Sequence, residues 1–309
     1  MLALFRPLLI VVLIFINTAY ADTTVSDNKL SVVATFSILA DMAQVIGGDY
    51  VEVYSLVGPE EDVHVYQPRP SDAQRLAKAD VLILNGLGFE GWIERLVAAS
   101  GYQGVIVRVS NNIPLLLSAD SDYGLHGHEN TSQSDPHAWQ SINNARVYSD
   151  NITQAFIAVD GARKNYYLSQ RDDYDLRLIE LDEEIRNSFA TIPHDRRKLL
   201  TSHRAYRYFE AASNIEFFAA QGINASADVS ARELAKLIRL IKSENIKAAF
   251  FERSSNQRLL QQIVRDTQCY IAGSLYADSL SKQGGPASTY LEMMRYNLNT
   301  IIGALLPRL

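Results

Sequence analysis

Cysteine is almost missing from this chain of 309 residues, because Cys269 is the only one. A single cysteine excludes an intrachain disulfide. Its neighbours, Thr267-Gln268 on one side and Tyr270-Ile271-Ala272 on the other, indicate the approach to a buried strand. We therefore interpret Cys269 as a core residue rather than a functional thiol.

A run of apolar residues long enough to span a membrane is lacking as well. Residues 7–16 are rich in Leu, Val and Ile, but this run is shorter than the ~20 residues that a span needs. It follows the lone charge of Arg6 and precedes Ala19-Tyr20-Ala21, an A-x-A cleavage signature. We predict a signal peptide at residues 1–21. No cysteine lies near the cleavage point, so we expect a secreted periplasmic protein that is not a lipoprotein.

An excess of positive charge is also lacking. The chain has 29 Lys and Arg against 35 Asp and Glu, a net charge of −6, and loss of Arg6 with the signal peptide makes it −7. This balance argues against a nucleic-acid partner and is compatible with cation binding.

What remains is about 290 residues, a length typical of two domains or lobes. Strand and helix patterns alternate along the first half. Residues 81–84 form a continuous apolar run of the kind that parallel sheets bury on both faces. We therefore predict an α/β lobe with a mostly parallel sheet, flanked by helices. Its expected strands are residues 30–36, 51–56, 81–84 and 105–109, and its expected helices are residues 38–46, 70–79 and 92–98.

The second half repeats this alternation, so we predict a second α/β lobe of the same kind. The helix expected at residues 230–243 is amphipathic, with Leu234, Leu237 and Ile241 on one face. The expected strands are residues 199–201, 215–218, 248–251 and 270–272, and the other expected helices are residues 206–212, 256–264 and 286–305.

Residues 144–189 lie between the two lobes and combine helical periodicity with many charges. Leu178, Leu181 and Ile185 still form an apolar stripe, which favours a helical connection that ends in a long helix over a disordered linker. We place the N-terminal lobe at residues 22–159, the linking helix at 160–190 and the C-terminal lobe at 191–309.

Four potential metal ligands, His64, His137, His203 and Asp278, each follow a predicted strand. Ligands of open α/β sheets bind beyond the carboxyl ends of the strands, so two sheets facing each other across a cleft would bring these side chains together. Three imidazoles and one carboxylate suit Zn²⁺ and could hold Mn²⁺ or Fe²⁺. Their spacings of 73, 66 and 75 residues match no local zinc motif such as H-E-x-x-H.

Five motifs occur along the chain: VATFSILAD at 33–41, GPEEDVHVYQP at 58–68, ADVLILNG at 79–86, DPHAW at 135–139 and SHRAYRYF at 202–209. In these motifs and their order, the chain resembles the cluster A-I solute-binding proteins of zinc and manganese ABC importers over nearly the whole mature length. The resemblance implies two α/β lobes joined by one long rigid helix, with the metal in the cleft between them.

This resemblance assigns the metal ligands to His64, His137, His203 and Asp278. Histidine at the third position favours zinc over manganese, because manganese carriers of the family tend to have glutamate there. The implied function is high-affinity capture of zinc, with manganese or iron as the alternative cargo, and delivery to an ABC permease in the inner membrane. A monomer is expected, and a periplasmic metallochaperone as a further partner is left open.

The chain departs from the family pattern around the site. Many zinc carriers have a long histidine-rich loop before D-P-H, whereas residues 118–134 contain only His126 and His128. These two could form a metal-gathering loop or simply belong to a solvated loop. Asp278 lies in Y-A-D-S-L rather than in the common D-P-L form, and Arg204 replaces a frequent acidic residue. Glu252, at the end of a predicted strand, could orient a ligand histidine or have a plain structural role.

We expect a carrier rather than an enzyme, because a closed shell of protein ligands suits transport better than catalysis. A metallohydrolase would need a vacant metal position and a general base, for which Glu252 is the one candidate. An exported adhesin of the same fold, with metal as a structural element, is a third reading of this sequence.

Overall fold

The computed structural model describes residues 28–117, 134–222, 229–253 and 257–306. The predicted signal peptide and the loop with His126 and His128 lie outside these residues. Within them, no helix is both long enough and apolar enough to cross a bilayer.

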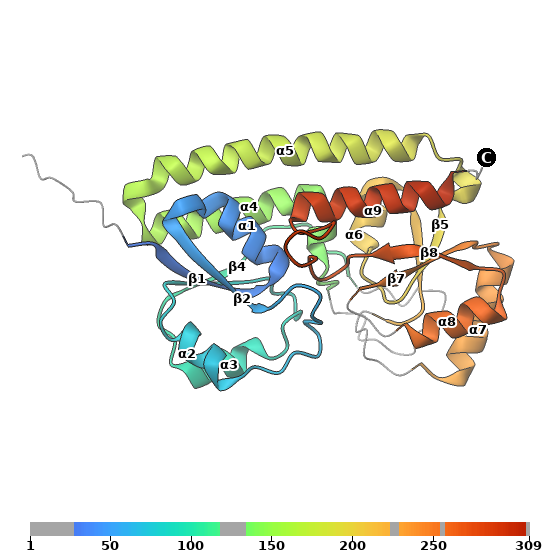
Figure 1. Ribbon diagram of the computed structural model, residues 1–309, viewed down its shortest axis with the longest axis horizontal. Coiled ribbons are helices and arrows are strands. Elements are labelled where there is room, and N and C mark those ends of the chain that lie inside the picture. The colour runs from blue at the N-terminus through green and yellow to red at the C-terminus, as the bar shows by residue number, and fades with distance from the viewer. Residues whose placement is uncertain (1–27, 118–133, 223–228, 254–256, 307–309) are drawn as a thin grey trace, which may run out of the picture.

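The N-terminal lobe contains a parallel four-stranded sheet (Figure 1). The strands are β1 (Leu30–Phe36), β2 (Val51–Val57), β3 (Val81–Leu84) and β4 (Val105–Arg108). The strand order is β2-β1-β3-β4. The inner strand β1 is buried almost throughout, as expected for a strand rich in Val and covered by helices on both faces.

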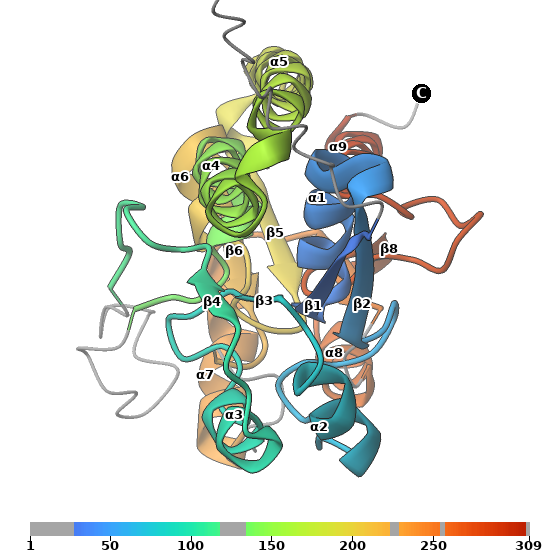
Figure 2. The same cartoon turned by 90° about the vertical axis from the view of Figure 1, so that its left-hand side faces the viewer.

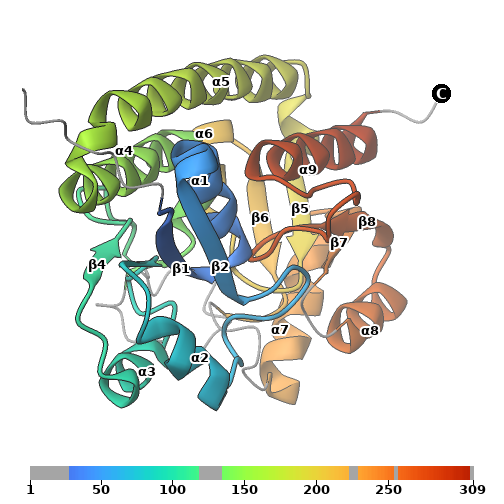
Figure 3. The same cartoon turned by 60° about the vertical axis from the view of Figure 1, so that its left-hand side comes forward.

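The C-terminal lobe repeats this topology with the strand order β6-β5-β7-β8, again all parallel. Figure 3 shows the two sheets side by side. The predicted fold class, two α/β lobes each with a parallel sheet, is therefore confirmed. The strands are β5 (Lys198–Thr201), β6 (Glu216–Ala219), β7 (Ala248–Glu252) and β8 (Tyr270–Leu275).

Helices lie on both sides of each sheet, and short 3-10 helices connect some of the elements (Figure 2). In the N-terminal lobe these are α1 (Ser37–Gly47), η1 (Gly48–Tyr50), α2 (Pro70–Leu76), α3 (Ile93–Ser100), η2 (Ala138–Gln140) and α4 (Ile142–Val159). The second half contains η4 (His194–Arg196), α6 (Arg207–Ser213), α7 (Ala231–Ser243), α8 (Arg258–Asp266) and α9 (Tyr290–Leu305).

A single helix of 27 residues, α5 (Lys164–Ala190), runs along both lobes after the turn η3 (Gly161–Arg163) (Figure 1). The expected stripe of Leu178, Leu181 and Ile185 is buried, and α5 packs on α4, α1, α6 and α9. Because these helices come from both lobes, α5 joins the lobes by packing as well as by chain connection.

The hydrophobic core consists of two clusters of buried side chains. The larger one runs from the sheet of the N-terminal lobe through α5 to α6 and α9, so the lobes share apolar packing. The smaller one lies between the second sheet and the helices α7 and α8. Cys269 belongs to this smaller core, where its thiol donates to Ile246 O, so its interpretation as a core residue is confirmed.

Candidate metal centre

Each candidate ligand lies beyond the carboxyl end of a strand or in the loop that follows it. His64 follows β2 in a loop where its own N–H donates to Asp62 Oδ1 at 2.8 Å. His137 immediately precedes η2, His203 comes two residues after β5, and Asp278 comes three residues after β8. Because the carboxyl ends of the two parallel sheets point toward the same region, these four residues meet between the lobes.

The four side chains converge on one point, and one ligand atom from each lies within 4.8 Å of all the others. His203 Nε2 is 3.2 Å from Asp278 Oδ2 and 3.4 Å from His137 Nε2. His64 Nε2 is 3.5 Å from Asp278 Oδ2, and His137 Nε2 is 3.6 Å from Asp278 Oδ1. Two ligand atoms about 2.0 Å from a tetrahedral zinc ion would be about 3.3 Å apart, so these separations have the size that zinc requires.

Buried carboxylates contact the Nδ1 atoms of two of the histidines, on the side of each ring that faces away from the centre. Asp135 Oδ1 lies 2.9 Å from His137 Nδ1 and also accepts the His137 backbone N–H. Glu252 Oε2 contacts His203 Nδ1, and Glu252 Oε1 accepts the His203 backbone N–H at 3.1 Å. A carboxylate accepts from an N–H, so these contacts place the imidazole proton on Nδ1 and leave the Nε2 lone pair facing the centre.

The buried position leaves polar atoms in the centre without hydrogen-bond partners. The side chains of His137, His203 and Asp278 are at most 2% exposed, and that of His64 is 4% exposed. His64 Nε2 and Asp278 Oδ1 make no hydrogen bond within the described structure. Buried polar atoms are costly without a partner, and a central cation would satisfy both.

The electrostatics of the centre also favour a cation. Although burial alone raises the pKa of Asp278, the charges of His203 and His137 hold it well below its usual range. Although burial alone lowers the pKa of His203, the carboxylates of Glu252 and Asp278 raise it well above its ordinary value. The centre therefore keeps Asp278 ionised and attracts positive charge, either a proton on His203 or a metal ion.

The Asp278 loop is held against the N-terminal lobe. Ala277 O accepts hydrogen bonds from Trp139 Nε1 and from Gln140 Nε2, both at 2.8 Å. Trp139 and Gln140 belong to η2, the turn that begins directly after His137. One short segment of the N-terminal lobe thus carries one candidate ligand and fixes the position of another.

Aromatic rings pack against two of the imidazoles of the centre. The Phe89 ring lies 4.9 Å from the His64 ring and 5.7 Å from the His137 ring, measured between centroids. Trp139 packs against both Phe89 and His137 and is fully buried. These rings exclude water from the imidazoles, which agrees with the low exposure of the centre.

From the sequence, Glu252 could either orient a ligand histidine or have a plain structural role. Its contacts with His203 favour the orienting role. Sequence reasoning missed Asp135, whose position two residues before His137 in the D-P-H motif was the available signal. Arg204, next to His203, is only partly exposed, and its backbone N–H donates to Gly222 O. The predicted loop histidines His126 and His128 lie outside the described residues.

A second buried network, also missed from the sequence, supports the backbone before His137. Asn85 Nδ2 donates to Pro136 O at 2.9 Å, and Asn85 Oδ1 accepts from the Tyr148 hydroxyl. Asn85 N–H in turn donates to the buried carboxylate of Glu90 at 2.6 Å. Asn85 therefore connects the end of β3 to the loop that positions His137.

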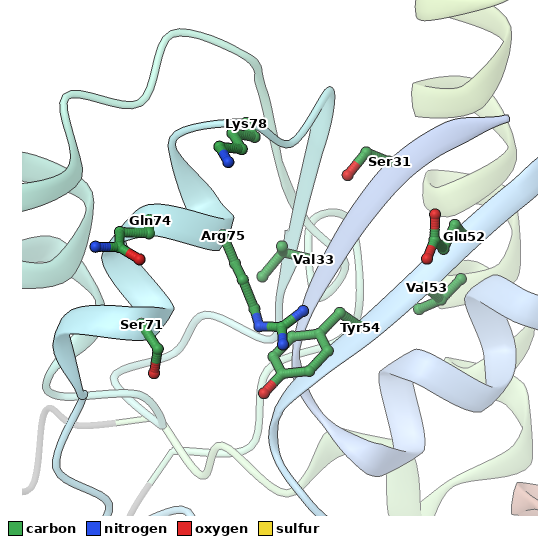
Figure 4. Close-up of a pocket in the computed structure, with 9 residues that line it drawn as sticks. All are labelled: Ser31, Val33, Glu52, Val53, Tyr54, Ser71, Gln74, Arg75 and Lys78. Carbon is green, nitrogen blue, oxygen red and sulfur yellow. The ribbon is translucent and has the colours of Figure 1, made fainter. Parts of the chain in front are cut away.

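A surface pocket of about 430 Å³ lies on the N-terminal lobe between β2 and α2 (Figure 4). In it the Arg75 guanidinium stacks over the Tyr54 ring, 4.0 Å from the centroid. None of the four candidate ligands lines this pocket, so it is separate from the centre. Its lining residues are Ser31, Val33, Glu52, Val53, Tyr54, Ser71, Gln74, Arg75 and Lys78.

Two parallel-sheet lobes, one long connecting helix and a buried cluster of imidazole and carboxylate donors between the lobes define a two-lobed metal-binding solute-binding protein. The sequence profile of the family described as ZnuA, "Zinc-uptake complex component A periplasmic", matches residues 32–304. The chain belongs to this family, as its motifs indicated.

Relatives and solved structures agree with this assignment. The manganese-binding lipoprotein MntA of Halalkalibacterium halodurans is 31% identical over 300 residues, with 96% of each chain covered. The iron ABC transporter substrate-binding lipoprotein MtsA of Streptococcus pyogenes serotype M1 is 31% identical, covering 93% of this chain and 94% of that protein. The periplasmic zinc-binding protein TroA of Treponema pallidum superposes with a TM-score of 0.82 at 25% identity, covering 91% of this chain and all of TroA.

These comparisons contradict one expectation. The sequence predicted a periplasmic protein that is not a lipoprotein, whereas MntA and MtsA are both named lipoproteins. The prediction rested on one local observation, the missing cysteine near Ala21, which concerns attachment at that point alone. The prediction that the protein is not a lipoprotein is therefore withdrawn.

Proposed function

We propose that this chain captures a divalent transition-metal ion through His64, His137, His203 and Asp278 and delivers it to an ABC importer. One observation carries this proposal: the donor atoms of all four side chains meet in a buried centre, at separations that fit a single ion. Family membership supports the transport role, because relatives such as MtsA are named ABC transporter substrate-binding proteins.

The ion is cargo rather than a catalyst. Four protein groups surround the centre, and His64, its most accessible member, has a side chain that is only 4% exposed. A catalytic metal site needs an open position for water, whereas a closed shell retains the ion until the lobes separate. Release to the importer therefore requires movement that exposes the buried centre.

Zinc is the cargo we propose. Three imidazole nitrogens and one carboxylate match its tetrahedral preference, and the contacts of Asp135 and Glu252 fix the tautomer and the orientation of two of the imidazoles. The named metals of the relatives span manganese, iron and zinc, so the choice of zinc rests on the donor set.

Manganese is the second candidate, and the carboxylate of Asp278 favours it. Both oxygens of Asp278 lie within 3.6 Å of a histidine Nε2 atom, so this carboxylate could bind an ion through two oxygens. A five-donor shell with two oxygens suits Mn²⁺ better than a strictly tetrahedral one, because manganese prefers oxygen ligands and higher coordination numbers.

Metal analysis of the purified protein, followed by competition titration of the metal-free form with Zn²⁺ and Mn²⁺, tests these proposals. We expect one tightly held zinc ion per chain that manganese does not displace. Preferred manganese would select the second candidate, and a protein that binds neither ion would overturn the proposed function.

Alanine variants assign the site. His64→Ala, His137→Ala and His203→Ala should each weaken binding by more than the about 100-fold that loss of an orienting partner can cause. His126→Ala tests the loop, and His194→Ala, on the exposed turn η4, is the matched control. If His126→Ala had as large an effect as the other three, the loop rather than the interlobe centre would be the site.

The domain limits and partners belong to the same proposal. We assign the lobes to residues 22–159 and 191–309, with 160–190 as the rigid link, and propose a monomer that docks on the membrane subunits of the importer. Sedimentation of the metal-loaded protein measures the monomer directly. Metal transfer from a metallochaperone to the His126 loop would show as faster loading of the wild type than of His126→Ala.

A further inference from the structure

Charge is distributed unevenly between the two halves of the chain. Residues 22–159 contain 7 Lys and Arg against 17 Asp and Glu, a net charge of −10, whereas residues 191–309 contain 16 against 10, a net charge of +6. The overall acidic charge of the protein therefore hides a basic C-terminal lobe. Such an asymmetry orients a molecule in any external electric field or near any charged surface.

The helix α7 concentrates this positive charge on one face. Arg232, Lys236, Arg239 and Lys242 follow one another at steps of four, three and three residues. Because an α-helix repeats every 3.6 residues, these steps place all four on the same side. The opposite side packs into the smaller core through Leu237 and Ile241, so the four cations form the outward surface, which we call the α7 face.

Three of the four cations of the α7 face are exposed, and Lys236 is partly exposed. Arg232, Arg239 and Lys242 are exposed, and none of the described carboxylates forms an ion pair with these three. The one acidic residue of the helix, Glu233, is engaged in a capping box with Ser230 at the N-terminus of α7. Arg232, Arg239 and Lys242 therefore keep positive charge that no described carboxylate neutralises.

The α7 face lies far from the other functional parts of the molecule. Figures 1 and 3 show α7 and its neighbour α8 on the side of the C-terminal lobe opposite α5. Seven acidic against four basic residues give α5 the opposite charge. The molecule is thus polarised from an acidic ridge along α5 to a basic face on α7, and none of the four candidate metal ligands belongs to either helix.

We propose that the α7 face docks on the anionic headgroups of a lipid bilayer and orients the protein with its C-terminal lobe toward the membrane. Arg232 and Lys242 are ten residues apart, about 15 Å along the helix. Cations spread over this length match a surface of repeated anionic groups rather than one small anion. The same surface repels the acidic N-terminal lobe, so only one orientation is favoured.

Co-sedimentation of the purified protein with lipid vesicles tests this proposal. One vesicle preparation contains one-third phosphatidylglycerol in phosphatidylethanolamine, and the other contains phosphatidylcholine alone. We expect binding to the anionic vesicles at low salt, none to the neutral ones, and release at about 0.5 M salt, where charges are screened within about 4 Å. The variant Arg232→Gln/Arg239→Gln/Lys242→Gln should bind about 100-fold more weakly, at about fivefold for each cation removed.

Matched variants separate the α7 face from net charge. Lys164→Gln/Arg177→Gln/Arg186→Gln removes three positive charges from α5 and should leave vesicle binding unchanged, and Arg232→Lys/Arg239→Lys should retain it. Melting temperature and zinc affinity check that each variant folds. Equal losses in the α7 and α5 variants, or no binding of the wild type to anionic vesicles, would overturn the proposal. The wild type could fail to bind vesicles while the α7 variant no longer delivers metal to the importer. In that case the partner of the α7 face is an acidic protein surface and the lipid proposal fails.

Discussion

Replacing Glu252 with glutamine tests how the structure prepares His203 for a metal ion. Glu252 is fully buried at the end of β7, and its two oxygens accept from His203 Nδ1 and from the His203 backbone N–H. Glutamine has nearly the same shape, but it offers one oxygen acceptor and one NH₂ donor. It can therefore accept only one of the two hydrogen bonds and must turn a donor toward the other N–H group.

The expected loss of metal affinity follows from this geometry. Removing the partner that orients a ligand histidine typically costs 10- to 100-fold in metal affinity, about 1.4 to 2.7 kcal/mol. We expect the upper part of this range for Glu252→Gln, because the substitution removes a charge as well as an acceptor. The centre itself keeps all four donor atoms, so binding should weaken without disappearing.

Competition with a chelating dye at fixed pH measures the zinc affinity of the variant. Glu244→Gln is the matched control, because Glu244 pairs with Lys198 at the surface of the same lobe and contacts no candidate ligand. This control should bind zinc like the wild type. Melting temperatures of both metal-free variants check that the lobe is folded.

Glu252→Gln should also change the pH dependence of zinc binding. Glu252 is the largest of the charges that raise the pKa of His203, so its neutralisation should lower that pKa and reduce competition from protons at mildly acidic pH. A folded Glu252→Gln protein with zinc affinity within twofold of wild type, and with an unchanged pH profile, would refute the orienting role of Glu252.

Four further predictions concern protons and buried hydrogen bonds. Metal binding requires that His203 is neutral, and its pKa is raised. Metal affinity should therefore fall as pH is lowered, beginning above the ordinary histidine pKa of about 6.5. Constant affinity between about pH 5 and about pH 8 would contradict this prediction. In the metal-free protein, protonation of His203 stabilises the folded state instead of opposing metal binding. This stability is fully present below about pH 6.5 and is lost as pH rises through the raised pKa of His203. Melting temperatures measured over a pH series test this. Tyr148→Phe leaves the Asn85 side-chain oxygen without its donor, so a denaturant titration should show about 1–3 kcal/mol lower stability. Zinc binding should weaken as well, because Asn85 also holds the backbone before His137. Unchanged zinc affinity would show that Asn85 does not help to position His137. Burial raises the pKa of Asp41 to about 6. Asp41→Asn should therefore stabilise the protein by at most about 3 kcal/mol above pH 6 and should have no effect near pH 4. Thermal melts that show equal effects at both pH values would refute this.

Much of the fold could be read from residue patterns. Residues 30–36 and 81–84 were predicted as strands and form β1 and β3, because apolar, β-branched runs of this length are buried on both faces of a parallel sheet. The connection at 144–189 was predicted to be helical with a long helix as its last part, and the structure has α4 and then the long helix α5 there; the position of the 3-10 turn between them, Gly161–Arg163, was not predicted. Local periodicity does not reveal such a turn when both flanking segments keep an apolar stripe.

The candidate site was less accessible to sequence reasoning. His64, His137, His203 and Asp278 could be proposed together, because each follows a strand and motifs support the choice. These residues are at least 66 positions apart in the chain, and only the packing of the lobes places their ligand atoms within 4.8 Å of one another.

The sequence by itself determined the α/β alternation, the core role of Cys269 and the choice of four candidate ligands, because these depend on local periodicity and on residue chemistry. Only the tertiary structure decided which side chains form hydrogen bonds to those residues and to the backbone next to them. Glu252 reaches His203 across 49 residues, and Asn85 reaches Pro136 across 51. The basic α7 face likewise became visible only when the other side of the helix was buried. Contacts over such distances depend on how packed elements meet in space, which no local pattern encodes.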